Sequence, residues 1–153
     1  MDTPTKLFQV AEVQLTYRPT FKTSERPRVT SSKDSYNILL EQWDHGKIDY
    51  VEEFKILLLN RGNRVLGMMT VSTGSTCGTL ADPKIIFTAA LKSNASALVL
   101  SHNHPSGTLK PSQPDLSLTK KLVDGGKLLD IKVLDHLIVT ADGYYSFADE
   151  GLI

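Results

Sequence analysis

Residues 97–107 read ALVLSHNHPSG, and this short stretch decides the fold that we expect for the whole chain. Its first part, Ala97 to Ser101, is short and almost wholly apolar, which is typical of a strand buried on both faces of a sheet. The part that follows holds two histidines, a proline and a glycine, so polar side chains gather where the strand ends. A strand buried on both faces needs a covering layer on each side.

The segments around this strand supply further strands and helices for those layers. Alternating or continuous apolar runs predict strands at 54–59, 65–71, 97–101, 131–140 and 144–147. The turn Asn60-Arg61-Gly62-Asn63 favours an antiparallel hairpin between the first two. Helical spacing of apolar residues predicts helices at 32–43 with Ser32 as N-cap, at 82–93, and from about 115 to Gly125-Gly126. The sequence therefore predicts an α/β fold, a mixed β-sheet flanked by helices.

The first 31 residues differ in composition from the rest of the chain. Residues 10–17 alternate between apolar and polar, which predicts a half-buried strand. Residues 18–32 carry two prolines, several basic side chains and few apolar ones, which is typical of an arm or a long loop. We therefore divide the chain into an N-terminal strand and basic arm, 1–31, and a domain, 32–153. A solvated connector and a nucleic-acid contact both remain open for the arm.

Length, charge and cysteine content exclude several classes of protein. The chain has 153 residues, 17 Lys+Arg and 17 Asp+Glu, so bulk attraction to nucleic acid or an anionic membrane is absent. No apolar run approaches the roughly 18 residues of a membrane span, and a TIM barrel needs about 250 residues. The single Cys77 excludes an intramolecular disulfide and the paired cysteines of zinc deaminases. We expect a cytoplasmic protein without a membrane partner.

The histidines after the central strand indicate a metal site. His102 and His104, two positions apart on an extended chain, project to the same side and can reach one cation. Asp115 follows at the start of a helix, where it can supply a third ligand and leave a fourth position open for water. An alternative is that Ser112 and Asp115 form only a helix capping box. We interpret His136, inside an apolar run, as a hydrogen-bonded interior histidine and not as a fourth ligand.

With these residues, the chain resembles the JAB/MPN metalloenzymes with their JAMM motif, and among them the RadC-like proteins. The motif His-x-His, seven residues, Ser, two residues, Asp is matched by His102, His104, Ser112 and Asp115. Gly78-Thr79-Leu80 and Leu134-Asp135-His136 are also similar to the RadC-like pattern, and the resemblance runs from about Ser32 to Ile153. It implies a mixed sheet flanked by helices of the cytidine deaminase-like type. It also implies a Zn²⁺ ion held by His102, His104 and Asp115, and an upstream glutamate as general acid and base.

Two adjacent residues, Glu52 and Glu53, are candidates for that glutamate. The RadC-like pattern Glu-x-Phe selects Glu52. Adjacent residues of a strand face opposite ways, so only one of them can face the metal. We therefore assign the catalytic roles to Glu52, as the proton shuttle, and to Ser112, as a donor to the developing oxyanion.

Two functions are consistent with these residues. The first is a zinc-dependent metallohydrolase, by resemblance a metallopeptidase or isopeptidase, in which Glu52 assists the attack of a zinc-activated water on an amide carbonyl. The alternative is a non-catalytic, metal-stabilised interaction module associated with DNA transactions. A third reading makes Cys77 a nucleophile, but a small buried thiol is the more economical interpretation. The sequence identifies no substrate and no oligomeric state.

Overall fold

A computed structural model describes residues 9–14, 17–74 and 81–153. In this part of the chain, one mixed sheet has the strand order β2-β1-β3-β4-β5. The strands are β1 (Glu53–Leu59), β2 (Val65–Thr73), β3 (Ala97–Asn103), β4 (Lys132–Val139) and β5 (Tyr144–Ser146). The helices are η2 (Thr23–Glu25, a 3-10 helix), α1 (Ser32–Gln42), α2 (Pro83–Lys92) and α3 (Gln113–Leu128). The predicted α/β fold with a mixed sheet is confirmed.

The strand directions bring the start of β1 beside the end of β3. β1 pairs antiparallel with β2, as the hairpin prediction required, and Asn63 in the turn adopts a positive φ of 59°. β1 also pairs antiparallel with β3, with Phe54 opposite His102. The connection from β3 to its parallel partner β4 runs through α3, the usual form of such a crossover. Residues that precede β1 therefore lie next to the histidines at the end of β3.

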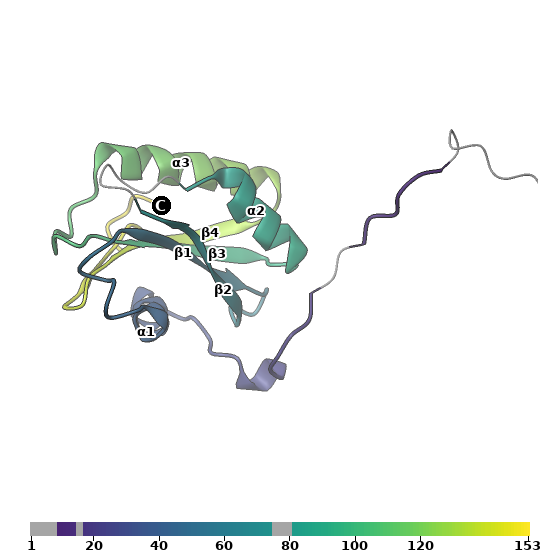
Figure 1. The fold of residues 1–153 in the computed structure, drawn as a ribbon, viewed down its shortest axis with the longest axis horizontal. Coiled ribbons are helices and arrows are strands. Elements are labelled where there is room, and N and C mark those ends of the chain that lie inside the picture. The colour runs from purple at the N-terminus through teal and green to yellow at the C-terminus, as the bar shows by residue number, and fades with distance from the viewer. Residues whose placement is uncertain (1–8, 15–16, 75–80) are drawn as a thin grey trace, which may run out of the picture.

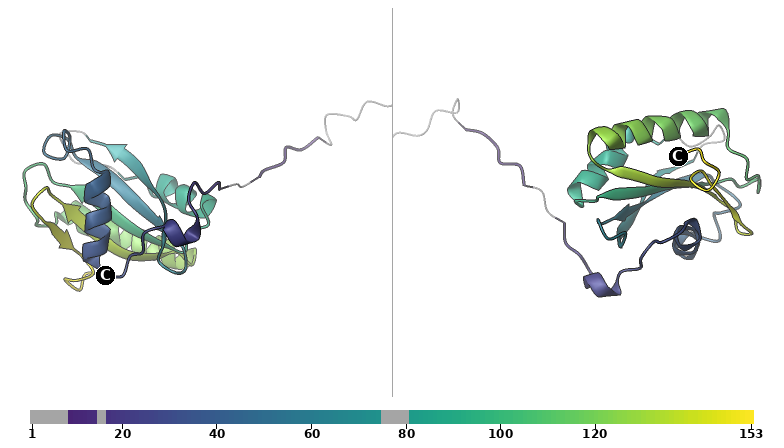
Figure 2. Two further views of the ribbon diagram at one scale, coloured as in Figure 1. Left: turned by 90° about the horizontal axis from the view of Figure 1, so that it is seen from below. Right: turned by 180° about the vertical axis from the view of Figure 1, so that it is seen from behind.

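Helices cover both faces of the sheet (Figures 1 and 2). α2 and α3 lie on one face, where Leu98 and Leu100 of β3 belong to the apolar cluster beneath them. α1 lies on the other face, over a second cluster that includes Val99. Because side chains alternate along a strand, the side chain of His102 lies on the face of the sheet that α3 covers, and that of Asn103 lies on the face that α1 covers.

Helix α3 begins at Gln113, as the capping box of Ser112 and Asp115 indicates, and ends later than the sequence predicted. Ser112 is its N-cap, with Asp115 completing a capping box. The helix continues through Gly125 and Gly126 to Leu128, so the prediction that this pair ends it is wrong. A Cβ at Gly126 would lie 2.3 Å from the carbonyl oxygen of Ile131. The glycine is there because the chain turns back against the helix on its way into β4, with Ile131 N donating to Gly126 O at 2.8 Å.

Three further predictions need correction or lie outside the described residues. Residues 9–14 and 17 form no strand, and Val10 is 92% exposed, because no neighbouring strand pairs with this part of the predicted strand 10–17. The N-cap of α1 is Ser31 and not Ser32. Cys77 and the motif Gly78-Thr79-Leu80 are outside the described residues. Among the described residues, none belongs to a helix with the length and hydrophobicity required to cross a bilayer.

Candidate metal centre

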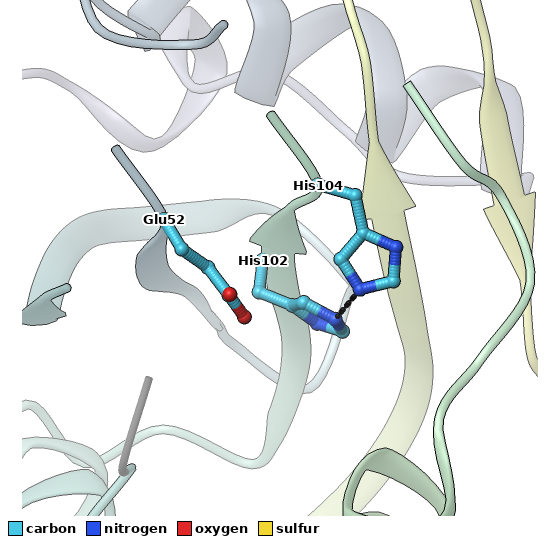
Figure 3. Close-up of side chains that lie close together, drawn as sticks. All are labelled: Glu52, His102 and His104. Carbon is cyan, nitrogen blue, oxygen red and sulfur yellow. Dashed lines mark hydrogen bonds between the residues drawn. The ribbon is translucent and has the colours of Figure 1, made fainter. Parts of the chain in front are cut away.

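The two histidines at the end of β3 meet through their Nε2 atoms. His102 is the penultimate residue of β3 and His104 lies just beyond the strand. Their Nε2 atoms are 3.0 Å apart, and the rings meet edge to face (Figure 3). His102 is 2% exposed, whereas His104 is partly exposed, so one ring is anchored in the core and the other is open to solvent. The predicted pairing of the two rings is present.

Asp115 reaches both histidines from the first turn of α3. Its Oδ1 is 3.4 Å from His102 Nε2, and its Oδ2 is 3.5 Å from His104 Nε2. The same carboxylate accepts from Ser112 N at 2.8 Å, while Asp115 N donates to Ser112 Oγ at 3.1 Å. The capping box and the ligand geometry therefore coexist, because the cap holds the carboxylate in the orientation that faces the imidazoles.

Hydrogen bonds on the far side of each ring fix where the protons lie. His104 Nδ1 is 2.7 Å from the backbone oxygen of Thr108. A carbonyl oxygen only accepts, so this nitrogen carries the proton and neutral His104 has its lone pair on Nε2. His102 Nδ1 is 2.8 Å from His136 Nε2, which makes the tautomer of His102 depend on that of His136.

Thr119 settles the tautomer of His136. Its hydroxyl donates to Asp115 O at 2.7 Å, so the same oxygen accepts from His136 Nδ1 at 2.6 Å. Complete burial lowers the pKa of His136 and keeps the ring neutral, so its Nε2 accepts from His102 Nδ1. The lone pair of His102 is thereby on Nε2, facing Asp115. A second ring nitrogen that donates to a fixed acceptor is the usual support of a metal-binding histidine.

This donor set fits a tetrahedral cation. The Nε2 lone pairs of His102 and His104 and the carboxylate of Asp115 lie close together, with a different carboxylate oxygen nearest each histidine. A zinc ion about 2.0–2.1 Å from tetrahedral ligands keeps those ligand atoms about 3.3 Å apart. The nearest pairs of atoms among the three side chains are 3.0 Å apart between the two histidines, and 3.4 and 3.5 Å apart between each histidine and its nearer Asp115 oxygen. Burial opposes the ionisation of Asp115, yet the two imidazoles beside the carboxylate, which stabilise it when protonated, hold the pKa of its carboxyl well below the usual range. The hydrogen bond to Asp115 raises the pKa of His104.

The two adjacent glutamates face opposite sides of the sheet. A carboxylate oxygen of Glu52 and one nitrogen from each histidine lie within 4.8 Å of one another, and Figure 3 shows the Glu52 carboxylate directed toward His102. Glu53 is buried beside Lys55, with its Oε2 3.7 Å from the ammonium nitrogen. The geometry thus places Glu52, and not Glu53, beside the candidate metal ligands.

Thr119 was not predicted from the sequence, and His136 was given only a structural role. The prediction that His136 is a hydrogen-bonded interior residue agrees with its contacts, because both ring nitrogens have partners. Its link to His102 was not foreseen. Thr119 lies four residues after Asp115, one helical turn along α3. That spacing is a signal from which its place in the network could have been inferred.

Comparison with known proteins agrees with this fold. The sequence profile of the RadC-like JAB domain matches residues 29–152. The chain belongs to the RadC-like JAB domain family. Among curated relatives of this RadC-like protein, a UPF0758 protein of Flavobacterium johnsoniae is 46% identical over 125 residues, covering 82% of this chain and 53% of that protein. UPF0758 proteins of Alkaliphilus metalliredigens and Methanosarcina mazei are 40% and 37% identical and cover 82% and 88% of this chain.

The chain spans about half the length of the curated relatives that it matches, 53% of the Alkaliphilus protein and 57% of the Methanosarcina protein. The mixed sheet with helices on both faces is consistent with the JAB/MPN fold, as the resemblance implied. The similarity therefore establishes the family of the domain, and the structure adds a candidate metal centre.

Proposed function

We propose that this RadC-like domain is a zinc-dependent hydrolase that cleaves an amide bond, as a metallopeptidase or isopeptidase. The observation that carries the proposal is the convergence of three lone pairs, from His102, His104 and Asp115, beside the carboxylate of Glu52. Three protein ligands, two nitrogens and one oxygen, are the arrangement of catalytic rather than structural zinc sites. A carboxylate next to such a site is suited to proton transfer.

Different residues of the chain carry out different steps of the proposed hydrolysis. A bound zinc ion would polarise an amide carbonyl and acidify a water molecule. Glu52 takes the proton from the water as its oxygen attacks the carbonyl carbon, and delivers that proton to the amine nitrogen as the carbon–nitrogen bond breaks. The helix cap uses a lone pair of Ser112 Oγ and not its proton. The Ser112 hydroxyl therefore stays able to donate to the developing oxyanion while it caps α3.

Metal analysis combined with a cleavage screen tests this function. The purified full chain should bind one zinc ion, and replacing either His102 or His104 by Ala should abolish stoichiometric binding. In a library of peptide and isopeptide substrates, Glu52→Gln should retain zinc and lose about 10²- to 10⁴-fold in turnover. Glu53→Gln is the matched control, because the neighbouring side chain faces the other side of the sheet, and it should keep the turnover of the wild-type protein.

One observation supports a second candidate function. Asp115 belongs to the first turn of α3 and His102 to β3, so a cation held between them would fix the connection 104–112 whether or not a reaction occurs. In that case the domain is a metal-stabilised interaction module. Full zinc occupancy with no cleavage of any substrate, together with loss of partner binding on chelation, would favour the module over the hydrolase.

A further inference from the structure

Asn103, between the two histidines, makes hydrogen bonds with every polar group of its side chain. It is the last residue of β3 and fully buried on the α1 side. Its Nδ2 donates to Ile48 O at 2.7 Å and to Val51 O at 2.8 Å. Its Oδ1 accepts from Glu53 N at 2.7 Å. A buried asparagine with both donor hydrogens and its oxygen engaged fixes the backbone that it contacts.

These hydrogen bonds bracket Glu52. Val51 and Glu53 are its immediate neighbours, and both are tied to the same Asn103 side chain. A third contact comes from the end of β2, where Gly74 N donates to Glu52 O at 2.6 Å. The approach is so close that a Cβ at Gly74 would lie 2.5 Å from the Glu52 oxygen. The backbone of Glu52 is thus held before, at and after the residue.

We propose that Asn103 is a positioning residue that places the Glu52 carboxylate at the metal centre. The inference rests on the proposed function insofar as it concerns turnover. Strand alternation provides the coupling, because His102 contacts the metal site on one face of β3 while Asn103 holds the Glu52 segment on the other. The backbone of residues 102–103 therefore positions both the proposed ligand His102 and the proposed proton shuttle Glu52. Misplacing a catalytic group by about 1 Å can cost on the order of 10²-fold in rate.

Metal affinity gives a readout that does not depend on turnover. The negative charge of Glu52 lies within 4.8 Å of the histidine nitrogens and assists the binding of a cation. Zinc dissociation constants, measured by chelator competition, should rise about tenfold in Glu52→Gln, within the range typical of groups around the ligands. Asn103→Ala should produce a similar rise. The double variant Asn103→Ala/Glu52→Gln should bind zinc as tightly as Glu52→Gln alone, because the asparagine affects zinc binding only through the glutamate.

A matched control is available on the same strand. Ser101 is fully buried on the same face as Asn103, and its hydroxyl donates across to β1, to Lys55 O at 2.8 Å. Ser101→Ala removes a buried hydrogen bond between the same two strands without touching the Glu52 segment. It should leave zinc affinity and turnover at the wild-type level. Amide hydrogen exchange should quicken at residues 48–53 in Asn103→Ala and stay unchanged there in Ser101→Ala.

A second variant covers the case in which Asn103→Ala does not fold. Gly74 lies just after β2 at a partly exposed position, and in Gly74→Ala the new Cβ would push against the backbone oxygen of Glu52. The loss of zinc affinity in this variant should likewise not add to that of Glu52→Gln. Where the wild type cleaves a substrate, Asn103→Ala or Gly74→Ala should lower turnover about 10- to 100-fold, and neither should slow Glu52→Gln further.

The outcomes separate this inference from the proposed function. A wild-type protein without turnover would contradict the hydrolase, yet the zinc-affinity cycle would still decide the role of Asn103. Wild-type zinc affinity in a folded Asn103→Ala protein, or losses that add to those of Glu52→Gln, would overturn the positioning role.

Discussion

Replacing Thr119 by Val tests whether the buried network behind His102 prepares it for a metal ion. Valine has nearly the shape of threonine but lacks the oxygen that accepts from His136 Nδ1 at 2.6 Å. Thr119 is 3% exposed and His136 is fully buried, so the protein offers the freed N–H little access to water. An unpaired buried donor costs about 1–3 kcal/mol. We therefore expect the metal-free variant to lose about 2 kcal/mol of unfolding free energy.

The network has one way to avoid this cost, and it damages the metal site. The proton of His136 can move to Nε2, but that nitrogen then faces the N–H of His102 at 2.8 Å. His102 must give up this proton and carry one on Nε2, where its lone pair faces Asp115. This shift of protons weakens metal binding, and the loss expected for such a supporting group is about 10- to 100-fold.

Two measurements on the same samples check the prediction. Chemical denaturation of the metal-free protein gives the stability change, and chelator competition gives the zinc dissociation constant. Thr119→Ser keeps the hydroxyl and removes only a methyl group, so it should retain wild-type zinc affinity. If Thr119→Val is destabilised but binds zinc as tightly as the wild type, the network does not set the tautomer of His102.

Three more predictions concern the cap, the acid range and a close contact. Ser112→Ala should lower the free energy of unfolding by about 1 kcal/mol, measured by denaturation. In an active enzyme it should also lower turnover about 10²- to 10³-fold. Unchanged kinetics would show that Ser112 takes no part in the reaction. Burial lowers the pKa of His136 in the folded protein, so the unfolded chain takes up this proton first, and metal-free stability should fall as pH drops below 6.5. The raised pKa of His104 acts in the opposite direction, because the stability that it contributes is lost as the pH rises above 6.5 and is constant below it. Denaturation at about pH 5 and pH 7 should show the fall in stability toward acid pH, and His136→Gln should make that fall smaller. Gly126→Ala should cost about 1–3 kcal/mol because of the 2.3 Å approach to Ile131 O, whereas Gly125→Ala, whose Cβ meets the Phe87 ring at 3.0 Å, should cost less.

Periodicity and turn residues predicted the strands β1–β5 and the helices α1–α3, but they also predicted a strand at 10–17 that residues 10–14 and 17 do not form. The hairpin and the buried central strand follow from local patterns, namely the Asn60–Asn63 turn and the apolar run after Ala97. Glycine was less informative, because Gly125 and Gly126 lie inside α3. A glycine ends a helix only when its own conformation turns the chain, and Gly126 instead makes room for a strand that arrives later. Such tertiary reasons are invisible in a local window.

Only those residues of the candidate site that lie close together in sequence could be predicted. His102, His104 and Asp115 were found because short separations on a strand and at a helix start constrain where side chains can go. Asn103 was overlooked although it stands between the two histidines, because its partners Ile48 and Val51 are some fifty residues away in sequence. Long-range partners depend on the strand order, which the sequence did not specify.

The crossover from β3 through α3 to β4 makes the candidate metal centre a contiguous unit of the chain. Residues 102–136 contain the histidines, the aspartate and the buried network that orients them. Glu52 alone comes from elsewhere, from the segment that leads into the β1–β2 hairpin. In the function proposed above, the three ligands and the proton shuttle therefore come from separate stretches of sequence. Under that proposal, a change at Glu52 would stop the chemistry and leave all three ligands in place, whereas changes within the crossover would remove metal binding and chemistry together.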